Sequence, residues 1–391
     1  MNILSLHNKY KTLGGEDVVF KQENHLLQKN AHKIYTYVRD NSELDLLSSV
    51  RAGIEAVWSI ESKNEVESLI KNNSIDIIHS HNTFSRLSPS IYYAASKNNI
   101  PVVQTLHNYR LICPNAMLFR DGDICELCVG HMPWSSLKYN CYRSSFSATL
   151  GAATVNGFHK LLGTWSRRVD RYIAVSEFLK RKYVQGGIPE DQIVVKPNFL
   201  SVDPGVGKGG GGYALYVGRL SKEKGIDSLL AGWRYVKRDI ALKIVGDGPL
   251  KPMVEHYIKE GLPIEYREVC PRSDIFSMMK GAEALIVPSL WYEPFGLVVI
   301  EAFASGLPVI TTGQGGLGEL VEDGVTGLIY APSDCFDMAE KLNDLVNNQS
   351  KREAISKNAR REYENKYTAE TNYKMLVSIY ENVLASKVRD D

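Results

Sequence analysis

Two carboxylates in the second half of the chain lie next to or within an apolar run, where an acidic side chain is unusual and could have a chemical role. Glu301 interrupts an apolar run that begins at Leu297, and Glu293 precedes that run. Burying a carboxylate alone costs on the order of several kcal/mol, so Glu301 must be solvated, paired or used. Ionised carboxylates only accept hydrogen bonds, which suits both residues to a ligand rich in hydroxyl groups. The alternative is that Glu301 lies on the polar stripe of an ordinary amphipathic helix.

Two cations lie upstream, directly after a run of residues typical of a strand. Arg219 and Lys224 are five residues apart in "YVGRLSKEKG", a spacing that suits a diphosphate. The alternative is two solvated surface charges. Pro294 and Gly296 cannot lie inside a stable helix, so a helix is predicted to begin near Gly296 or Leu297. Its free N–H groups could hold phosphate oxygens.

The first half places glycines and histidines at predicted strand ends. Gly14 and Gly15, in "GGED", could adopt positive φ and approach a phosphate or an acceptor closely; the alternative is a plain turn. His107 ends the run "PVVQTLH", and its residue type alone favours a structural histidine. His79 and His81 have no partner in view along the sequence, so metal binding by them is not expected.

Four cysteines cluster after His107, with the spacing C-x11-C-x2-C-x12-C: Cys113, Cys125, Cys128 and Cys141. A C-x2-C pair between two further cysteines resembles a structural zinc site, which is one hypothesis. The other is that they are reduced core cysteines. The "DGD" at 121–123 is interpreted as a glycine turn flanked by acids, and not as a nucleotide-metal site.

Short β-branched or aromatic runs alternate with segments of helical length, which predicts two parallel sheets covered by helices. The first six runs are "NILSLH", "KIYTYV", "DIIHSH", "PVVQTLH", "RYIAVS" and "IVVKPN". After a Gly-rich stretch come "YALYVGR", "ALKIVGDG", "IEYREV", "ALIVPS", "PVITTG" and "GLIYAP". Ligands of such sheets bind beyond the carboxyl ends of the strands.

The domain prediction follows from this alternation. Residues 1–200 form an acceptor-binding, Rossmann-like domain, with a cysteine-rich insertion at 108–145 and a completing C-terminal helix at about 372–391. Residues 201–212 are a Gly-rich linker and hinge, and 213–371 form a nucleotide-sugar-binding, Rossmann-like domain.

Bulk composition excludes some classes of protein. The 391 residues are 44% hydrophobic and 23% charged, with a net charge of +1 that gives no global attraction to nucleic acid. The N-terminus reads as a strand and not as a signal peptide, and no run is apolar for the length of a membrane span. A cytoplasmic protein is predicted.

One segment is locally basic. Residues 138–196 hold ten Lys/Arg and four Asp/Glu, with Phe158, Leu161, Leu162 and Trp165 interleaved. One hypothesis is a peripheral contact with the inner face of the cell membrane that brings a lipid-linked acceptor to the cleft. An ordinary solvated helix face is the other.

Several motifs together resemble the retaining glycosyltransferases of family 4, which have the GT-B fold of two facing Rossmann-like domains. They are "VGRLSKEKG", "VGDGP", "EPFGLVVIEAFASGLPV" and "GGLGELVEDGVTGLI", in order across 213–331. The first half matches more loosely, through "GGED", "IIHSH", "TLHNYR" and "AVSEF". The cysteine cluster departs from the family pattern.

The resemblance implies a role for each matching residue. Glu301 would bind the ribose, Arg219 and Lys224 the diphosphate and Glu293 the donor sugar, with His107 near the transferred sugar. Catalysis would involve His107, Glu293, Arg219 and Lys224 and need no metal. The expected donor-binding residues are Gly14, Gly15, Arg219, Lys224, Glu293, Phe295, Gly296, Leu297 and Glu301.

The predicted function is therefore retaining transfer of a hexose from a nucleotide sugar, UDP favoured over GDP, to a saccharide or lipid-linked saccharide in surface polysaccharide biosynthesis. A sugar-nucleotide epimerase of the same fold is the nearest alternative. A dinucleotide-dependent oxidoreductase is less favoured, because no G-x-G-x-x-G follows a strand. A non-catalytic scaffold that uses the cysteine cluster is a further alternative.

Overall fold

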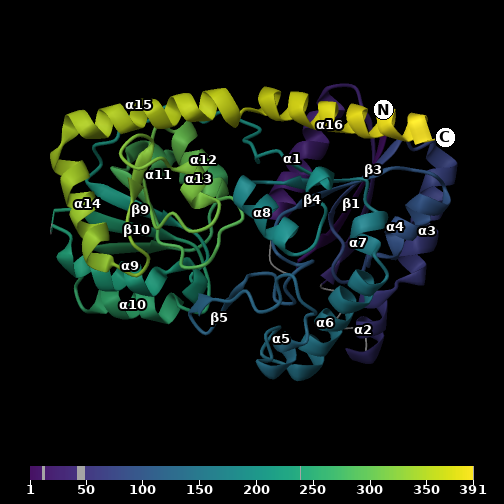
Figure 1. Cartoon of the computed structure of the whole chain (residues 1–391). Coiled ribbons are helices and arrows are strands. Elements are labelled where there is room, and N and C mark those ends of the chain that lie inside the picture. The colour runs from purple at the N-terminus through teal and green to yellow at the C-terminus, as the bar shows by residue number, and fades with distance from the viewer. Residues whose placement is uncertain (11–13, 42–48, 238, 391) are drawn as a thin grey trace. The chain divides into compact units, whose positions relative to one another are not determined.

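The computed structural model describes residues 1–10, 14–41, 49–237 and 239–390 (Figure 1). Every strand that the sequence predicts is present. The strands gather into two six-stranded parallel sheets, each accompanied by helices, so the prediction of two Rossmann-like α/β domains is confirmed.

The chain divides into two compact units. The first unit contains Met1–Leu118, Glu126–Asn198 and Ala369–Asp391, and the second contains Phe119–Cys125 and Phe199–Thr368. The division differs from the predicted one in the cysteine-rich insertion, because a short piece of it groups with the second unit.

The predicted linker at 201–212 also belongs to the second unit. The backbone N–H of Gly207 donates to the carbonyl of Ser305 at 2.9 Å, and that of Gly211 to the carbonyl of Gly281 at 2.9 Å. These bonds hold most of the glycine-rich stretch against its own domain, so it is not a free hinge.

The first sheet has the strand order β2-β1-β3-β4-β7-β8, all parallel. From β1 the chain continues to β2 on one side and later to β3 on the other side, so the direction of the strand order reverses between β1 and β3. Sheets of this kind bind ligands at that point. The strands are β1 (Asn2–Lys9), β2 (Lys33–Asp40), β3 (Ile77–Asn82), β4 (Val102–Leu106), β7 (Arg171–Ala174) and β8 (Ile193–Val195).

The second sheet has the order β11-β10-β9-β12-β13-β14 and reverses between β9 and β12. Its core is formed by apolar residues of the strands and of helices α9 (Ile226–Gly232) and α14 (Cys335–Asn347). The strands are β9 (Tyr213–Val217), β10 (Ala241–Val245), β11 (Ile264–Arg267), β12 (Ala284–Val287), β13 (Val309–Thr311) and β14 (Gly327–Ile329).

Helices connect these strands. The first unit contains α1 (Gly15–Lys29), α2 (Ser49–Val57), α3 (Ile60–Asn73), α4 (Ser90–Lys97), α5 (Ser135–Lys138), α6 (Phe146–Leu161), α7 (Thr164–Arg167), α8 (Glu177–Gln185) and α16 (Ala369–Asp390). The second contains α9 (Ile226–Gly232), α10 (Lys251–Lys259), α11 (Arg272–Gly281), α12 (Leu297–Ala304), α13 (Leu317–Leu320), α14 (Cys335–Asn347) and α15 (Gln349–Lys366). No helix in the described part of the chain is long and apolar enough to cross a membrane.

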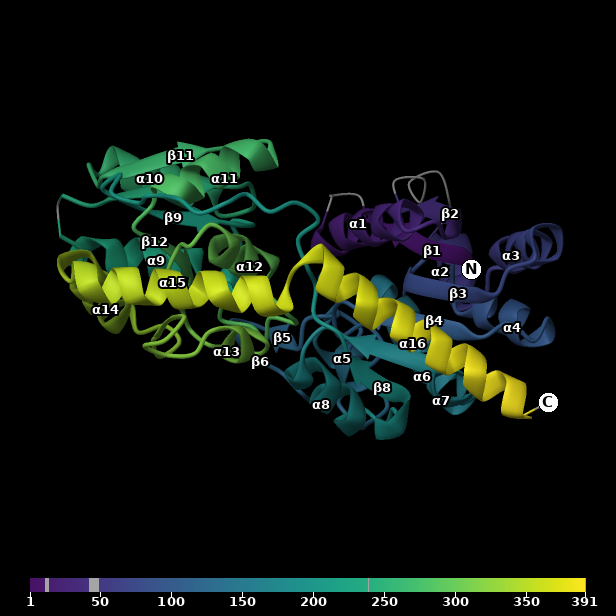
Figure 2. The ribbon, with the colours of Figure 1, turned by 90° about the horizontal axis from the view of Figure 1, so that it is seen from above.

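The last helix, α16, completes the first unit. Leu376, Tyr380 and Val383 are buried against Ile3 and Ile77 of the sheet, and Figure 2 shows α16 crossing these strands. The helix begins slightly before the predicted start at about 372, because α15 ends at Lys366 and a bridge at Thr368 separates the two helices. Its predicted last residue, Asp391, lies outside the described residues.

The "DGD" sequence forms the turn of a small antiparallel hairpin, β5 (Phe119–Arg120) with β6 (Asp123–Ile124). Asp121 and Gly122 both have positive φ, of 55° and 98°. Two such residues in succession are typical of a tight hairpin turn, so the interpretation as a glycine turn is confirmed.

Candidate active site

The reversal point of the second sheet brings the predicted donor-binding residues of that unit together. Arg219 follows β9 and Glu293 follows β12, and these two strands are neighbours. Carboxyl ends of parallel strands meet at one edge of the sheet, so the two side chains belong to the same edge. Arg219 is exposed, and no ion pair of its guanidinium is present among the described residues.

Lys224 and Glu293 form an ion pair between Nζ and Oε1. Glu293 is buried, and the hydroxyl of Ser289 donates to the same oxygen at 2.9 Å. The ammonium of Lys224 also lies 5.1 Å from the centre of the Trp291 ring. The cation expected at the diphosphate and the carboxylate expected at the sugar are thus in direct contact, which orients both.

Helix α12 begins at Leu297, with Gly296 preceding it, which confirms the predicted start. Gly296 has a φ of 114°, and a Cβ there would lie 2.8 Å from Cδ2 of Leu317, so a glycine is required. Phe295 is buried, and its ring packs against Tyr367, with 6.0 Å between ring centres. Any contact of Phe295 with a donor would therefore use its backbone.

Glu301 is buried but not alone. Its side chain forms an ion pair with the guanidinium of Arg272, the first residue of α11. Burial raises the pKa of Glu301 to about 7, and Arg272 opposes that rise. Arg272 was missed in the sequence because nothing local connects "CPRSD" to the helix that carries Glu301. The sequence left open whether Glu301 is solvated, paired or used, and the structure shows that it is paired.

In the first unit the "GGED" motif starts α1, but its glycines do not have the predicted conformation. Gly14 is extended, with a φ of −115°, and Gly15 is the first helical residue, so neither has positive φ. The contacts of this motif are instead made by its two acidic residues, Glu16 and Asp17. Asp17 accepts hydrogen bonds from the backbone N–H of Gly14 at 2.7 Å and from His7 at 2.8 Å, which ties the helix start to β1.

Glu16 is the second acid of this motif, and sequence reasoning missed it as a site residue. It is buried and accepts hydrogen bonds from Asn82 at 2.9 Å and from Asn108, the residue after His107, at 3.0 Å. Burial, followed by the charge of Asp17, raises its pKa to about 8. At neutral pH this carboxyl group is therefore largely protonated.

His107 is half-buried at the end of β4 and is coupled to His81 on β3. Its Nε2 lies 3.0 Å from Nδ1 of His81, and the two rings stack with 5.2 Å between their centres. Burial lowers the pKa of each histidine well below the usual value. Both rings are therefore neutral at pH 7, and the bond between them contains one proton.

The position of Glu23 indicates which of the two histidines carries that proton. Its Oε1 lies 2.6 Å from Nζ of Lys196, and its Oε2 lies 3.6 Å from Nε2 of His81. Neither Oε2 nor this Nε2 has a hydrogen bond to any described residue. A carboxylate faces an N–H and not a lone pair, so the proton of His81 is on Nε2. His81 Nδ1 then accepts from His107 Nε2, which leaves Nδ1 of His107 unprotonated.

Glu23, His79 and His81 also form the one group of three or more metal-ligating side chains within 4.8 Å of one another among the described residues. Both ring nitrogens of His79 and one oxygen of Glu23 already have partners, and Glu23 Oε2 and His81 Nε2 face each other at 3.6 Å. His79 lies 2.8 Å from Thr105 and 2.7 Å from Tyr380, and Lys196 supplies a cation at Glu23. The cluster is therefore a hydrogen-bonded network, and the partners that the sequence did not reveal are contributed by α1 and α16.

None of the four cysteines forms a disulfide bond in the described structure. Cys113 is buried beside Asn115, with Sγ 2.9 Å from Oδ1, whereas Cys125, Cys128 and Cys141 are half-buried. The three that lie in the first unit do not form a metal-ligating group within 4.8 Å in the described structure.

Zinc binding by these thiols stays a prediction, which this geometry does not support. The hypothesis expects about one zinc ion per chain by elemental analysis and loss of that zinc in Cys128→Ser. A metal-free protein with unchanged thermal stability after chelation would contradict it.

The basic segment at 138–196 is less exposed than its composition implies. Lys196 is buried in the network described above, and Trp165, a residue of α7, is buried against the rings of Tyr92 and His159. Phe158, Leu161 and Leu162 are exposed as expected.

Comparison with known proteins identifies the family. The model named Glycosyltransferase Family 4 matches residues 47–203, and the model named Glycosyl transferases group 1 matches residues 205–362. An uncharacterized glycosyltransferase of Methanocaldococcus jannaschii is 27% identical over 323 residues, which are 81% of this chain and 78% of that protein.

Solved structures share the fold. HepE of Anabaena in complex with UDP has a TM-score of 0.69 at 18% identity, over 98% of this chain and 100% of that one. The lipopolysaccharide outer core galactosyltransferase WaaB has a TM-score of 0.64 at 18% identity, over 99% and 100%. The chain belongs to the family 4 glycosyltransferases, and its fold is GT-B. It is a glycosyltransferase that uses a nucleotide-sugar donor, so the oxidoreductase and scaffold alternatives are set aside.

Proposed function

We propose that the protein transfers a hexose from a UDP-sugar, with retention of configuration, to a saccharide or lipid-linked saccharide in surface polysaccharide biosynthesis. Support for the donor comes from HepE, whose structures hold UDP and UDP-glucose. Support for the acceptor class comes from WaaB, a galactosyltransferase of the lipopolysaccharide outer core. We place the enzyme in the cytoplasm.

The observation that carries the proposal is the Lys224–Glu293 ion pair beside the start of α12. Departure of a nucleoside diphosphate develops negative charge on its phosphate oxygens. Lys224, Arg219 and the free N–H groups of α12 would meet that charge without a metal ion. Glu293 would accept hydrogen bonds from the sugar hydroxyls and at the same time hold Lys224 in place.

In the proposed reaction the acceptor oxygen attacks the anomeric carbon from the face that the diphosphate leaves. The bond from that carbon to the phosphate oxygen breaks, the bond to the acceptor oxygen forms, and the acceptor's proton passes to a phosphate oxygen. His107 would lie beside the transferred sugar, with its unprotonated Nδ1 available to accept a hydrogen bond from a hydroxyl.

A thermal-shift screen over nucleotide sugars tests the donor class. A ligand at 100 times its dissociation constant stabilises the folded state by about 2.7 kcal/mol, and the largest shift is expected for a UDP-sugar. Product analysis then separates transfer from epimerisation, because an epimerase converts the donor without an acceptor. Conversion of the donor alone, with no glycoside formed, would contradict the proposal.

Peripheral membrane contact remains part of the proposal, now through Phe158, Leu161 and Leu162, without Trp165 and Lys196. Vesicle flotation with anionic liposomes is expected to recover the protein in the floating fraction. Recovery at the level seen with neutral liposomes would contradict it.

We expect His81 to act as a positioning residue for His107. His81→Phe removes the acceptor at Nδ1 and should lower kcat about tenfold to a hundredfold, with the donor KM little changed. His81→Asn places an amide oxygen near the lost nitrogen and should restore much of the activity. The exposed His25→Phe on α1 is the matched control. Equal losses in the Phe and Asn variants would point to a purely structural role.

A further inference from the structure

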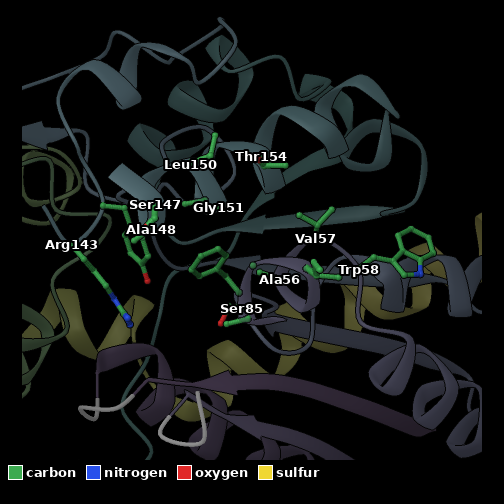
Figure 3. A pocket seen from close by; sticks show the side chains of 16 residues that line it. Ala56, Val57, Trp58, Ser85, Arg143, Ser147, Ala148, Leu150, Gly151 and Thr154 are labelled. Carbon is green, nitrogen blue, oxygen red and sulfur yellow. The ribbon is translucent and has the colours of Figure 1, made fainter. Parts of the chain in front are cut away.

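The first unit contains an apolar groove between α2 and α6 (Figure 3). Its volume is about 860 Å³, and Ile54, Val57, Trp58 and Leu150 contribute to its walls. Two of these residues are unusually exposed for aliphatic side chains, Ile54 at 64% and Leu150 at 43%. Gly151 of α6 also faces the groove, and a Cβ built on it would meet nothing within 4 Å. The groove is therefore open space bounded by apolar surface.

One charged side chain lines the groove among the described residues, and it is a cation. Arg143 lies over the ring of Tyr142, with 5.3 Å between its guanidinium carbon and the ring centre. No carboxylate forms an ion pair with it in the described part of the chain. An apolar wall with an unpaired guanidinium matches an amphiphile that has a hydrocarbon tail and an anionic group.

The groove lies beside a small pocket that contains His107. Phe84 and Tyr142 line the groove, and the guanidinium of Arg110 lies 4.4 Å and 5.0 Å from their ring centres. Arg110 in turn lines a small pocket together with His107. The groove and the pocket of His107 are therefore separated only by the side chain of Arg110, and this closeness favours a substrate over a separate protein partner.

We infer that this groove binds the hydrocarbon chain of a lipid-linked acceptor, with the acceptor's phosphate at Arg143 and its saccharide directed toward His107. The inference rests on the proposed function for the reaction itself, and it selects the lipid-linked saccharide from the two acceptor classes named there. Burial of the chain against Ile54, Trp58 and Leu150 would supply affinity, and Arg143 would set the register of the phosphate.

Binding of a simple amphiphile tests the inference without any transfer reaction. Farnesyl phosphate, used below its micelle concentration, is titrated calorimetrically into the whole protein, with farnesol and inorganic phosphate in parallel. Farnesyl phosphate is expected to bind at least about tenfold more tightly than farnesol, the scale of one charge-assisted hydrogen bond. Inorganic phosphate should show no binding in the same range. Equal binding of phosphate alone would overturn the inference.

Two variants locate the site. Gly151→Phe fills the groove from a helical position with open space and should weaken farnesyl phosphate binding more than tenfold. Gln28→Phe, which adds an aromatic ring at an exposed position of α1 outside the groove, should bind as the natural protein does. Arg143→Gln should reduce the affinity for farnesyl phosphate to that for farnesol. Unchanged binding in Gly151→Phe overturns the inference.

Failure of the groove and failure of the proposed function give different results. Transfer from a UDP-sugar to a free saccharide, together with no binding of farnesyl phosphate, overturns the groove alone. Binding that is lost in Gly151→Phe, together with no transfer from any UDP-sugar, keeps the groove as a lipid site and removes the proposed function.

Discussion

Replacing Lys224 by methionine is expected to lower kcat about 10²–10³-fold, the scale seen when a preorganised group at a developing negative charge is removed. Methionine keeps most of the length of the side chain and removes the charge. The donor KM should change little if the ammonium acts mainly on the leaving diphosphate, because such an interaction strengthens in the transition state. Steady-state kinetics with a UDP-sugar and the acceptor measure both quantities.

The control for this prediction is Lys222→Met, an exposed lysine of the same short helical turn. Its kcat should stay near that of the natural enzyme. Removing Lys224 also leaves Glu293 with Ser289 as its remaining hydrogen-bond donor, so thermal unfolding must show that the variant is folded. A folded Lys224→Met protein with kcat within a few-fold of the natural value would show that the site assignment is wrong.

Nucleotide-sugar binding is expected to depend on pH through Glu301. Its pKa in the free protein is raised to about 7 by burial, and the ionised form is the one that accepts two ribose hydrogen bonds. Below pH 7 the proton must leave before the donor binds, so Kd should rise up to about tenfold for each pH unit of acidification. Calorimetry with UDP-glucose at pH 6, 7 and 8 measures this, because its diphosphate does not titrate in that range.

Glu301→Gln should remove this pH dependence and weaken binding at pH 8 by about 10-fold to 100-fold, as expected for loss of a charged acceptor. The exposed Glu255→Gln on α10 is the control, and it should retain both the affinity and the pH dependence. A Glu301→Gln protein whose Kd equals the natural value at every pH would remove the ribose assignment.

The strands of the two parallel sheets could be predicted because their signal is local, whereas their order in each sheet was not predicted. Each strand is a short β-branched or aromatic run. The break at Pro294 and Gly296 predicted a helix start near Gly296 or Leu297, and α12 begins at Leu297. The glycine turn at 121–123 could also be predicted, because the residue types of a turn favour its backbone conformation locally. Local propensity did not reveal that Gly14 is extended or that the linker is bound to the second unit.

The pairing of the charged groups was not predictable in this way. Glu301 meets Arg272, which is 29 positions away, and Glu23 meets Lys196, which is 173 positions away. Lys196 looked like part of a basic surface, yet it neutralises a buried acid. Residue spacing indicates which groups could be charged, but it does not show which strand ends become neighbours.

By itself, the sequence determined the element types, the two α/β domains, the family and the residue types of the site, because periodicity, turn chemistry and motif order are properties of short stretches. Only the tertiary structure decided that Glu301 is paired with Arg272, that Lys224 and Glu293 are in contact, and which protons His81 and His107 hold. The physical reason is that parallel sheets bring the carboxyl ends of distant strands to one edge, where burial and neighbouring charges set each group's protonation.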